Sequence, residues 1–272
     1  MTRDFFDDVT GALLSRRDFN RKLGLGAVLL GASALGGGTT AGHASKRADT
    51  RSSVADEDVM NFALNLEYLE AEFYLRAVRN TSLVELGVIS PADTTGPTVG
   101  GKMVPNLGAD AAEYIARAIG DDEMNHVKFF RSTLGSAAVK KPAINLDALG
   151  FGFASTAEFL KLARIFEDTG VSAFNGAAGL LADKGHLEAA ARILATEAEH
   201  SGAIRFLALS HNVESPAFDD LDIPPTKGHP FSTDPQRGMT VARDPQQVLR
   251  IVYGGKAGRG GFYPEGLNGT VK

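Results

Sequence analysis

The chain has 272 residues, 43% of them apolar, which is enough for a buried core and excludes a disordered or fibrous protein. Its formal net charge of −5, with no Lys/Arg run interleaved with aromatic residues, argues against nucleic-acid binding. Cysteine is absent, which excludes disulfides, thiolate sites and iron–sulfur clusters, so only oxygen and nitrogen ligands could hold a metal.

The N-terminal segment has the pattern of an export signal. Arg16 and Arg17 precede a weakly apolar, glycine-rich run and a stretch of small residues, which is typical of a twin-arginine signal. The apolar run of about 13 residues is shorter than the ~20 of a membrane-spanning helix, so an N-terminal anchor is the weaker alternative. We predict a signal over residues 1–44, with cleavage after residue 41 as the alternative, and a polar linker over 45–55. The twin-arginine translocase should then export the protein to the periplasm or beyond, and the mature form should not span a membrane.

Helical periodicity predicts an all-α fold with four long helices after the linker. An acidic first turn from Asp56 marks the start of the first helix, and Ser155 three residues before Glu158 marks the start of the third. Long connections, over residues 81–108 and 135–154, follow the first and second helices. The predicted helices span about 56–80, 109–134, 155–182 and 186–211, with a short turn at 183–185.

Two copies of a Glu-x-x-His motif are the most informative feature of the chain. Glu123 precedes His126, and Glu197 precedes His200, each inside a predicted helix. Residues three apart share a helix face, and one isolated pair of this kind is more often solvated than a metal site. Two pairs together can form half of a dinuclear metal cage, because bundles that hold two metals add one Glu from each of two further helices.

Glu67 and Glu167 are the candidates for those two further carboxylates. Tyr74 follows Glu67 by seven residues, and Phe174 follows Glu167 at the same offset. Seven residues are almost two helical turns, so each aromatic residue lies on the stripe of its Glu. The chain therefore repeats one helix-pair pattern. Burying four carboxylates without cations would oppose folding, since like charges repel strongly in a low dielectric.

This order of residues resembles the ferritin-like superfamily, whose di-metal carboxylate members use Glu, Glu-x-x-His, Glu, Glu-x-x-His. The resemblance spans about residues 56–212 and implies a four-helix bundle that holds two divalent metal ions, manganese or iron, with zinc as an alternative. It implies Glu67 and Glu167 as single carboxylate ligands, Glu123 and Glu197 as bridging carboxylates, and His126 and His200 as terminal nitrogen ligands.

Four further residues are predicted around these ligands. In related bundles the Asp before the Glu-x-x-His motif, here Asp122, accepts the second imidazole N–H of a ligand His. Thr196 has the equivalent position on the last helix, so this outer layer should be asymmetric. Glu70, one turn after Glu67, is expected to support the ligands or to be exposed rather than to be a seventh ligand. Tyr74 is a candidate catalytic phenol, with simple packing as an equal alternative.

Sequence position also predicts the environment of other side chains. Glu72 and Glu199 should point away from the ligand stripe and be solvated. Phe62, Phe166 and Phe206 should belong to the core.

The composition of the chain changes after residue 212. Residues 213–272 are rich in proline and glycine and contain one short predicted helix at about 245–253. The extension is too apolar for a free tail, so we expect it to pack on the bundle or on a neighbouring subunit. The segments LNLEYLEAEFY and DPQQVLRIVYGG resemble the exported ferritin-like branch that includes plant desiccation-related proteins.

Two functions follow from the resemblance. The first is an exported di-metal oxidoreductase that reacts with peroxide or dioxygen at open metal positions. The alternative is a non-catalytic metal-binding or stress-protective protein, which the likeness to desiccation-related proteins favours. A structural bundle with a vestigial site is a third hypothesis, and the retention of all six ligands argues against it. A homo-oligomer is compatible with either function, but nothing in the sequence indicates a mineral-storing cage.

Overall fold

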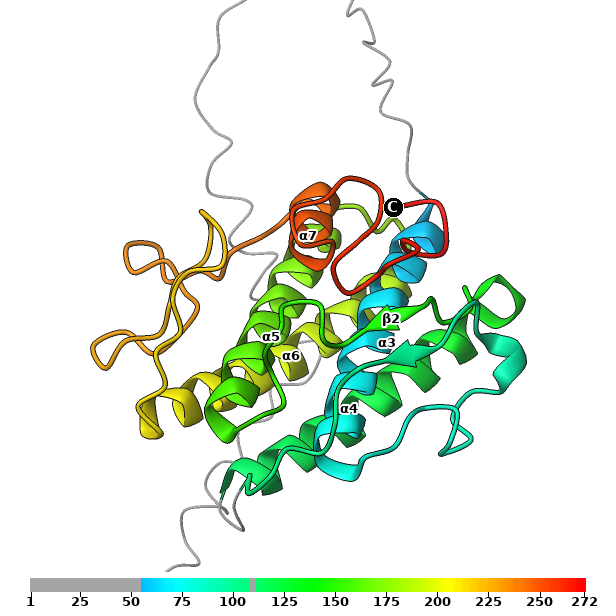
Figure 1. Cartoon of the computed structure of the whole chain (residues 1–272). Helices are drawn as coiled ribbons and strands as arrows, with labels where there is room; N and C mark the ends of the chain where they lie inside the picture. Colours follow the sequence, from blue (N-terminus) through cyan, green and yellow to red (C-terminus); the bar gives the residue numbers. More distant parts are fainter. Residues whose placement is uncertain (1–54, 108–110) are drawn as a thin grey trace, which may run out of the picture. The chain divides into compact units, whose positions relative to one another are not determined.

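Four long α-helices form the centre of the computed structural model, which describes residues 55–107 and 111–272 (Figure 1). Helix α3 packs mainly against α4, and α5 packs mainly against α6. The predicted all-α bundle is confirmed. The four helices span Asp56–Arg79 (α3), Ala111–Leu134 (α4), Thr156–Ala178 (α5) and Lys184–Ser210 (α6).

The predicted N-terminal signal over 1–44 lies outside the described residues, as does the predicted linker over 45–55 except for its last residue. Within the part of the chain that the structure describes, none of the helices is both long and apolar enough to cross a membrane.

Side-chain caps set the helix starts on the α5–α6 side of the bundle. The hydroxyl of Ser155 accepts the backbone N–H of Glu158, as the spacing of these residues predicts. The carboxylate of Asp183 accepts the backbone N–H groups of Gly185 and His186, so α6 already begins at Lys184. The predicted turn at 183–185 is therefore wrong in its position, and α5 ends four residues earlier than expected, at Ala178.

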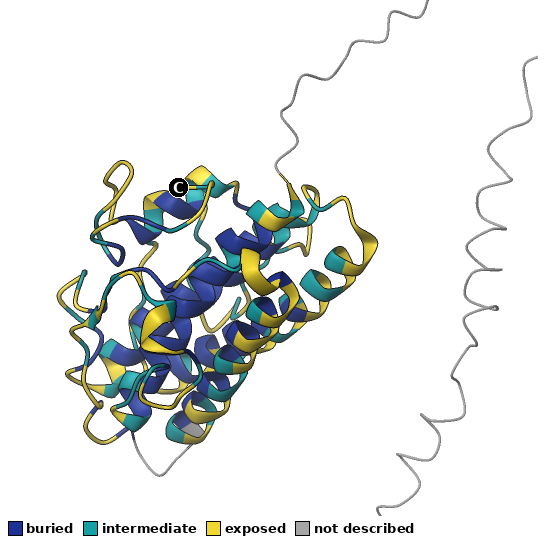
Figure 2. Cartoon of the chain, turned by 90° about the vertical axis from the view of Figure 1, so that its right-hand side faces the viewer, coloured by how far each residue is buried: buried dark blue, intermediate teal, exposed yellow. Residues whose placement is uncertain are grey.

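Helix α3 is buried on nearly all its faces, as the buried residues in the interior of Figure 2 illustrate. The two long connections run across it and pair as short parallel strands, Thr98–Val99 (β1) and Ile144–Asn145 (β2). The first connection also contains a 3₁₀ turn at Pro91–Asp93, and the second begins with one at Gly135–Ala137. None of these elements follows from the sequence pattern. Glu72, which we predicted to be solvated, is fully buried because these connections cover its face of α3.

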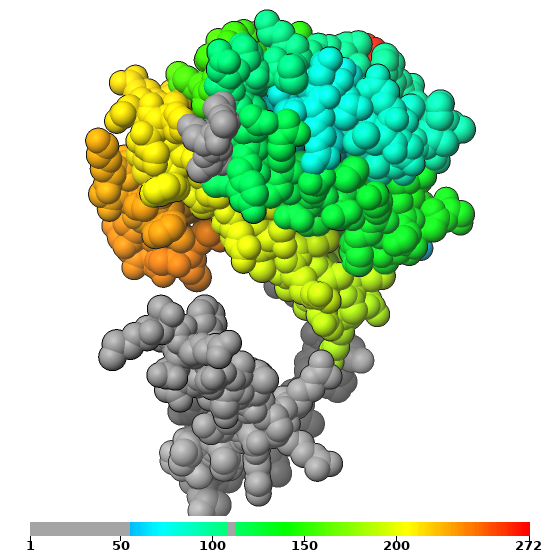
Figure 3. All heavy atoms as spheres, turned by 90° about the horizontal axis from the view of Figure 1, so that it is seen from below, coloured from blue at the N-terminus to red at the C-terminus, as the bar shows by residue number. Residues whose placement is uncertain are grey.

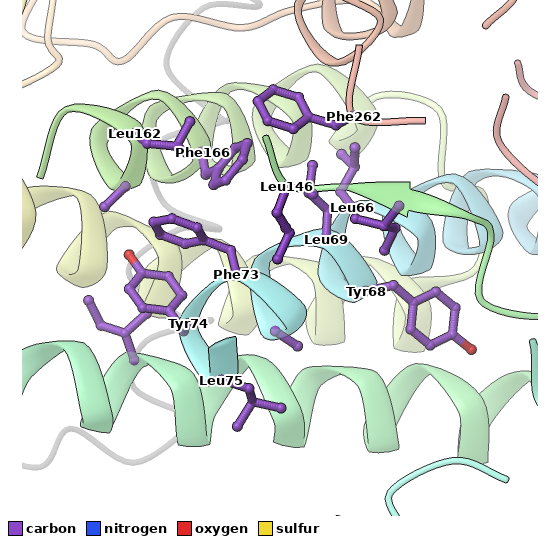
Figure 4. Close-up of a cluster of buried hydrophobic side chains, with 14 of the residues drawn as sticks. Leu66, Tyr68, Leu69, Phe73, Tyr74, Leu75, Leu146, Leu162, Phe166 and Phe262 are labelled. Carbon is purple, nitrogen blue, oxygen red and sulfur yellow. The ribbon is translucent and has the colours of Figure 1, made fainter. Parts of the chain in front are cut away.

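The C-terminal extension packs on the bundle and carries helix α7 (Pro245–Val252). The Tyr263 hydroxyl donates to the backbone oxygen of Asn65 in α3 at 2.7 Å. Phe262 packs edge-on against Phe166 of α5, which in turn meets Phe73 of α3 (Figure 4). The final residues of the chain thus complete the aromatic core between α3 and α5.

A buried ionic network holds the irregular part of the extension. Asp168 of α5 accepts hydrogen bonds from Arg164 and from Arg205 of α6. Both arginines also donate to the extension, Arg164 to Asp222 and Arg205 to the carbonyl oxygens of Ile223, Pro230 and Phe231. The network therefore connects residues 216–231 to the bundle. No sequence motif predicted this network.

Candidate metal centre

The six predicted ligands converge in the middle of the bundle. All six are buried, and the four carboxylates are fully so. Their ligand atoms form two groups of four, and within each group all atoms lie within 4.8 Å of one another. The first group contains Glu67, Glu123, His126 and Glu197, and the second contains Glu123, Glu167, Glu197 and His200. Glu123 and Glu197 belong to both groups, which is the position that bridging carboxylates require.

The imidazole of His126 faces several carboxylates at once. Its Nδ1 lies 3.1 Å from Glu67 Oε2, 3.2 Å from Glu123 Oε2 and 3.4 Å from Glu197 Oε1. One ring nitrogen carries at most one proton, so it cannot donate to three oxygens. This convergence on a common point is the arrangement expected of ligands around a cation.

Several buried atoms of the cluster have no hydrogen-bond partner. His200 Nδ1 is 2.9 Å from Glu123 Oε1, yet the two atoms are not aligned for a hydrogen bond. An unsatisfied buried polar atom costs about 1–3 kcal/mol, so several together require an explanation. Divalent manganese, iron or zinc would satisfy this set of carboxylate and imidazole atoms, and the residues therefore fit such ions. The atoms concerned are Glu67 Oε1, Glu123 Oε1, Glu167 Oε2, both carboxylate oxygens of Glu197, and His200 Nδ1.

Burial disfavours the charged form of most carboxylates in the cluster. It raises the pKa of Glu67 and of Glu167 above the usual value for glutamate. Burial, together with the neighbouring charge of Glu123, raises the pKa of Glu197 to about 8. A protein that keeps these groups ionised needs positive charge next to them.

The two imidazoles supply part of that positive charge. Burial acts against a charge on His200, but contacts with Glu123 and Glu167 outweigh it and raise its pKa to about 12. Burial opposes a charge on His126 as well, yet the charge of Glu67 and the other carboxylates raise its pKa far above the usual value. Burial alone would raise the pKa of Glu123, but both imidazoles together lower it well below its usual range. Bound divalent cations would supply this positive charge in place of the two imidazoles.

Asp122 and Tyr74 both contact predicted ligands. Asp122 Oδ2 lies 3.2 Å from His200 Nε2, so the Asp of α4 meets the His of α6. The buried Tyr74 hydroxyl donates to Glu167 Oε1 at 2.5 Å. Thr196, at the equivalent position of α6, donates to the carbonyl oxygen of Arg192 on its own helix at 3.4 Å.

Glu70 is also brought to the cluster. It is buried in α3, and burial, followed by the charges of Glu197 and other carboxylates, raises its pKa well above the usual value. Gly170 lies opposite it in α5 and was not recognised from the sequence. Gly170 follows Glu167 by three residues, just as Glu70 follows Glu67. This matching position in the repeat was the sequence signal that could have pointed to Gly170.

Helices α4 and α6 form one outer face of the molecule, where they lie side by side (Figure 3). Both ligand histidines come from these two helices, and their side chains retain a little exposure, 11% for His126 and 6% for His200. Asp122, which contacts His200, is half exposed on this face. The cluster is therefore closest to solvent on its α4–α6 side.

Comparison with known proteins agrees with this geometry. A family model described as a ferritin-like domain matches residues 55–210. The matched range includes helices α3 to α6 and all six predicted ligands. A comparison with curated proteins finds no match.

Proposed function

The chain belongs to the ferritin-like domain family, and we propose that its buried Glu/His cluster binds two divalent metal ions side by side. The observation that carries the proposal is the overlap of the two ligand groups, since each contains Glu123 and Glu197. Two ions that share these carboxylates would cancel the charge of four glutamates. The cations would also satisfy the buried oxygens that lack hydrogen-bond donors.

Each ion would have two ligands of its own in addition to the shared pair. Glu67 and His126 complete the first group, and Glu167 and His200 complete the second. Six protein residues shared by two ions leave coordination positions for a small oxygen-containing substrate. The donor set suits manganese or iron, with zinc as the alternative.

When bound, the two ions would supply Lewis-acid and redox chemistry toward peroxide or dioxygen. The protein residues around them orient the ligands. Asp122 would accept the Nε2–H of His200, which leaves the Nδ1 lone pair of that ring directed toward the ions. The Tyr74 hydroxyl holds Oε1 of Glu167 and leaves Oε2 available.

The physiological setting that we propose is outside the cytoplasm, in the response to oxidative or desiccation stress. Its support is the twin-arginine pattern at Arg16 and Arg17 and the resemblance to exported ferritin-like proteins. Cell fractionation of the chain and of an Arg16→Lys, Arg17→Lys double variant tests the export, and equal location of the two would contradict it.

A non-catalytic metal-binding role is the second candidate. The observation that favours it is the complete burial of the four carboxylates, which restricts access to the cluster. In this case the ions would hold the bundle together and would be sequestered, with no turnover of an oxidant.

The first experiment measures the metal content of the purified full chain and of a ligand variant. We expect about two manganese or iron ions per chain, and loss of most of that metal in Glu197→Gln, which removes a charge from both ligand groups. Glu199→Gln is the matched control, because Glu199 is exposed on the same helix. Wild-type protein with less than about 0.2 metal per chain after loading would contradict the proposal.

Addition of hydrogen peroxide to the loaded protein then separates the two candidate functions. Sustained oxygen release that depends on Glu197 would indicate an enzyme. A stable metal content without turnover would indicate binding and protection.

A further inference from the structure

A fifth buried carboxylate lies next to the six predicted ligands. Glu70 follows Glu67 by three residues on α3, and only 4% of its surface is exposed. Among the described residues, no basic side chain forms an ion pair with it. After burial, the largest influences on its pKa are the carboxylates of Glu197, Glu123, Glu167 and Glu67, and each of them raises it. A buried acid without a cation beside it is costly, so its position requires an explanation.

Gly170 shows where this carboxylate points. A Cβ atom at position 170 would lie 3.0 Å from Glu70 Oε1 and 2.6 Å from Glu197 Oε2. The two carboxylates therefore reach the same small space, which only a glycine leaves open. Glu197 belongs to both ligand groups, so this space borders the site between the two ions.

The internal repeat explains why the space exists. Glu70 stands three residues after Glu67 on α3, and Gly170 stands three residues after Glu167 on α5. The repeat thus places a carboxylate on α3 and no side chain at the corresponding position of α5. Glu70 and Gly170 belong to the α3–α5 half, whereas both ligand histidines belong to α4 and α6.

We propose that Glu70 is a seventh protein ligand of the metal pair, on the α3–α5 side, and that Gly170 provides the room for it. The proposal rests on the dinuclear site proposed above. An oxygen ligand in this place would occupy a coordination position otherwise open to water or to a small oxygen-containing substrate. Glu70 would therefore limit access to the metals, and its side chain would have to move before a substrate binds there.

Manganese(II) alone is the probe for the test, added to the metal-stripped full chain. Chelator competition gives the affinity for each ion, and the relaxation rate of water protons reports how many water molecules exchange on the bound ions. In Glu70→Ala we expect about a 10-fold or greater loss of affinity for at least one ion. We also expect faster water-proton relaxation per bound ion, because water takes the vacated position.

Two further variants keep the test independent of folding. Glu70→Gln preserves the shape of the side chain and should lower the affinity in the same direction. Gly170→Ala should act similarly, because the added methyl group would displace the carboxylates of Glu70 and Glu197. Glu199→Ala, exposed on α6, is the control and should bind manganese like the wild type.

The outcomes separate the two proposals. Wild-type protein that binds about two manganese ions, with unchanged affinity and relaxation in both Glu70 variants, would overturn the role of Glu70 alone. Wild-type protein that binds no manganese, iron or zinc would overturn the dinuclear site and this inference with it.

Discussion

At the residue scale, Tyr74 is the most informative side chain next to the predicted ligands. Its hydroxyl is the hydrogen-bond donor to Glu167 Oε1, and both groups are buried. A hydrogen bond to a charged group contributes about 1.5–3 kcal/mol. We therefore expect Tyr74→Phe to lower the free energy of unfolding by about that amount and to weaken metal binding, because Glu167 is no longer held in place. Urea unfolding and chelator competition measure the two effects.

Tyr68 provides a matched control for this prediction. Its hydroxyl accepts a hydrogen bond from Arg131 and donates to the carbonyl oxygen of Val139, away from the cluster. Tyr68→Phe should reduce stability without changing metal affinity. Equal metal affinity in the Tyr74 and Tyr68 variants would show that Tyr74 is a packing residue only.

At the element scale, Asp56 connects the start of α3 to the turn between α5 and α6. Its carboxylate accepts the backbone N–H groups of Ala182 and Asp183, each at 2.9 Å, and contacts His186. These hydrogen bonds, the one from Ala182 first, lower the pKa of Asp56 below the usual 3.8. A lowered pKa means that the contact is fully present above pH 3.8 and is lost as the pH falls through the lower, folded-state value.

Hydrogen exchange at the amides of Ala182 and Asp183 tests this connection. Both amides should be protected at neutral pH, and the protection should decrease only below the usual aspartate value of 3.8. Asp56→Ala should remove the protection at every pH. Glu57→Ala, an exposed neighbour in the same first turn, should leave it intact. Unchanged protection in Asp56→Ala would mean that other contacts hold the turn.

The four helices of the bundle and their order along the chain could be predicted because they follow a regular apolar period. The start of α5 could also be read from its Ser155 cap. The convergence of the two Glu-x-x-His motifs with Glu67 and Glu167 also follows from that period. Their role as ligands stays a prediction until metal is measured.

The features that could not be predicted from the sequence depend on contacts between segments that are far apart in the chain. Glu72 was predicted to be solvated because the helical period puts it opposite Glu67 and Glu70, but crossing connections cover that face. Phe206 was predicted to be core from its hydrophobicity alone. It lies two residues after the inward-facing Ile204, and 65% of its surface is exposed. Parallel pairing of β1 with β2 likewise depends on two segments that are far apart in the chain.

At the scale of the whole molecule, folding and metal binding should be coupled. The cluster places four fully buried carboxylates together, and ions that bind only the folded chain stabilise it by mass action. With free metal at 1,000 times the dissociation constant, the gain is about 4 kcal/mol. We expect the manganese- or iron-loaded protein to unfold at a clearly higher temperature than the stripped protein.

Calorimetry with and without a chelator measures this difference. Glu197→Gln lacks a carboxylate common to both ligand groups, so its unfolding temperature should change little when metal is added. Glu199→Gln should respond to metal like the wild type. Identical unfolding temperatures for loaded and stripped wild-type protein would contradict the coupling.

The contact between the C-terminal residues and α3 has a consequence for synthesis on the ribosome. Helix α3 precedes the other described helices in the chain, yet Tyr263 and Asn268 bind Asn65 and help to cover it. The ribosome synthesises the chain from its N-terminal end. The part of α3 that the C-terminal residues cover therefore stays exposed while about two hundred further residues are added. We therefore expect that the bundle cannot complete its packing around Asn65 until translation is almost finished.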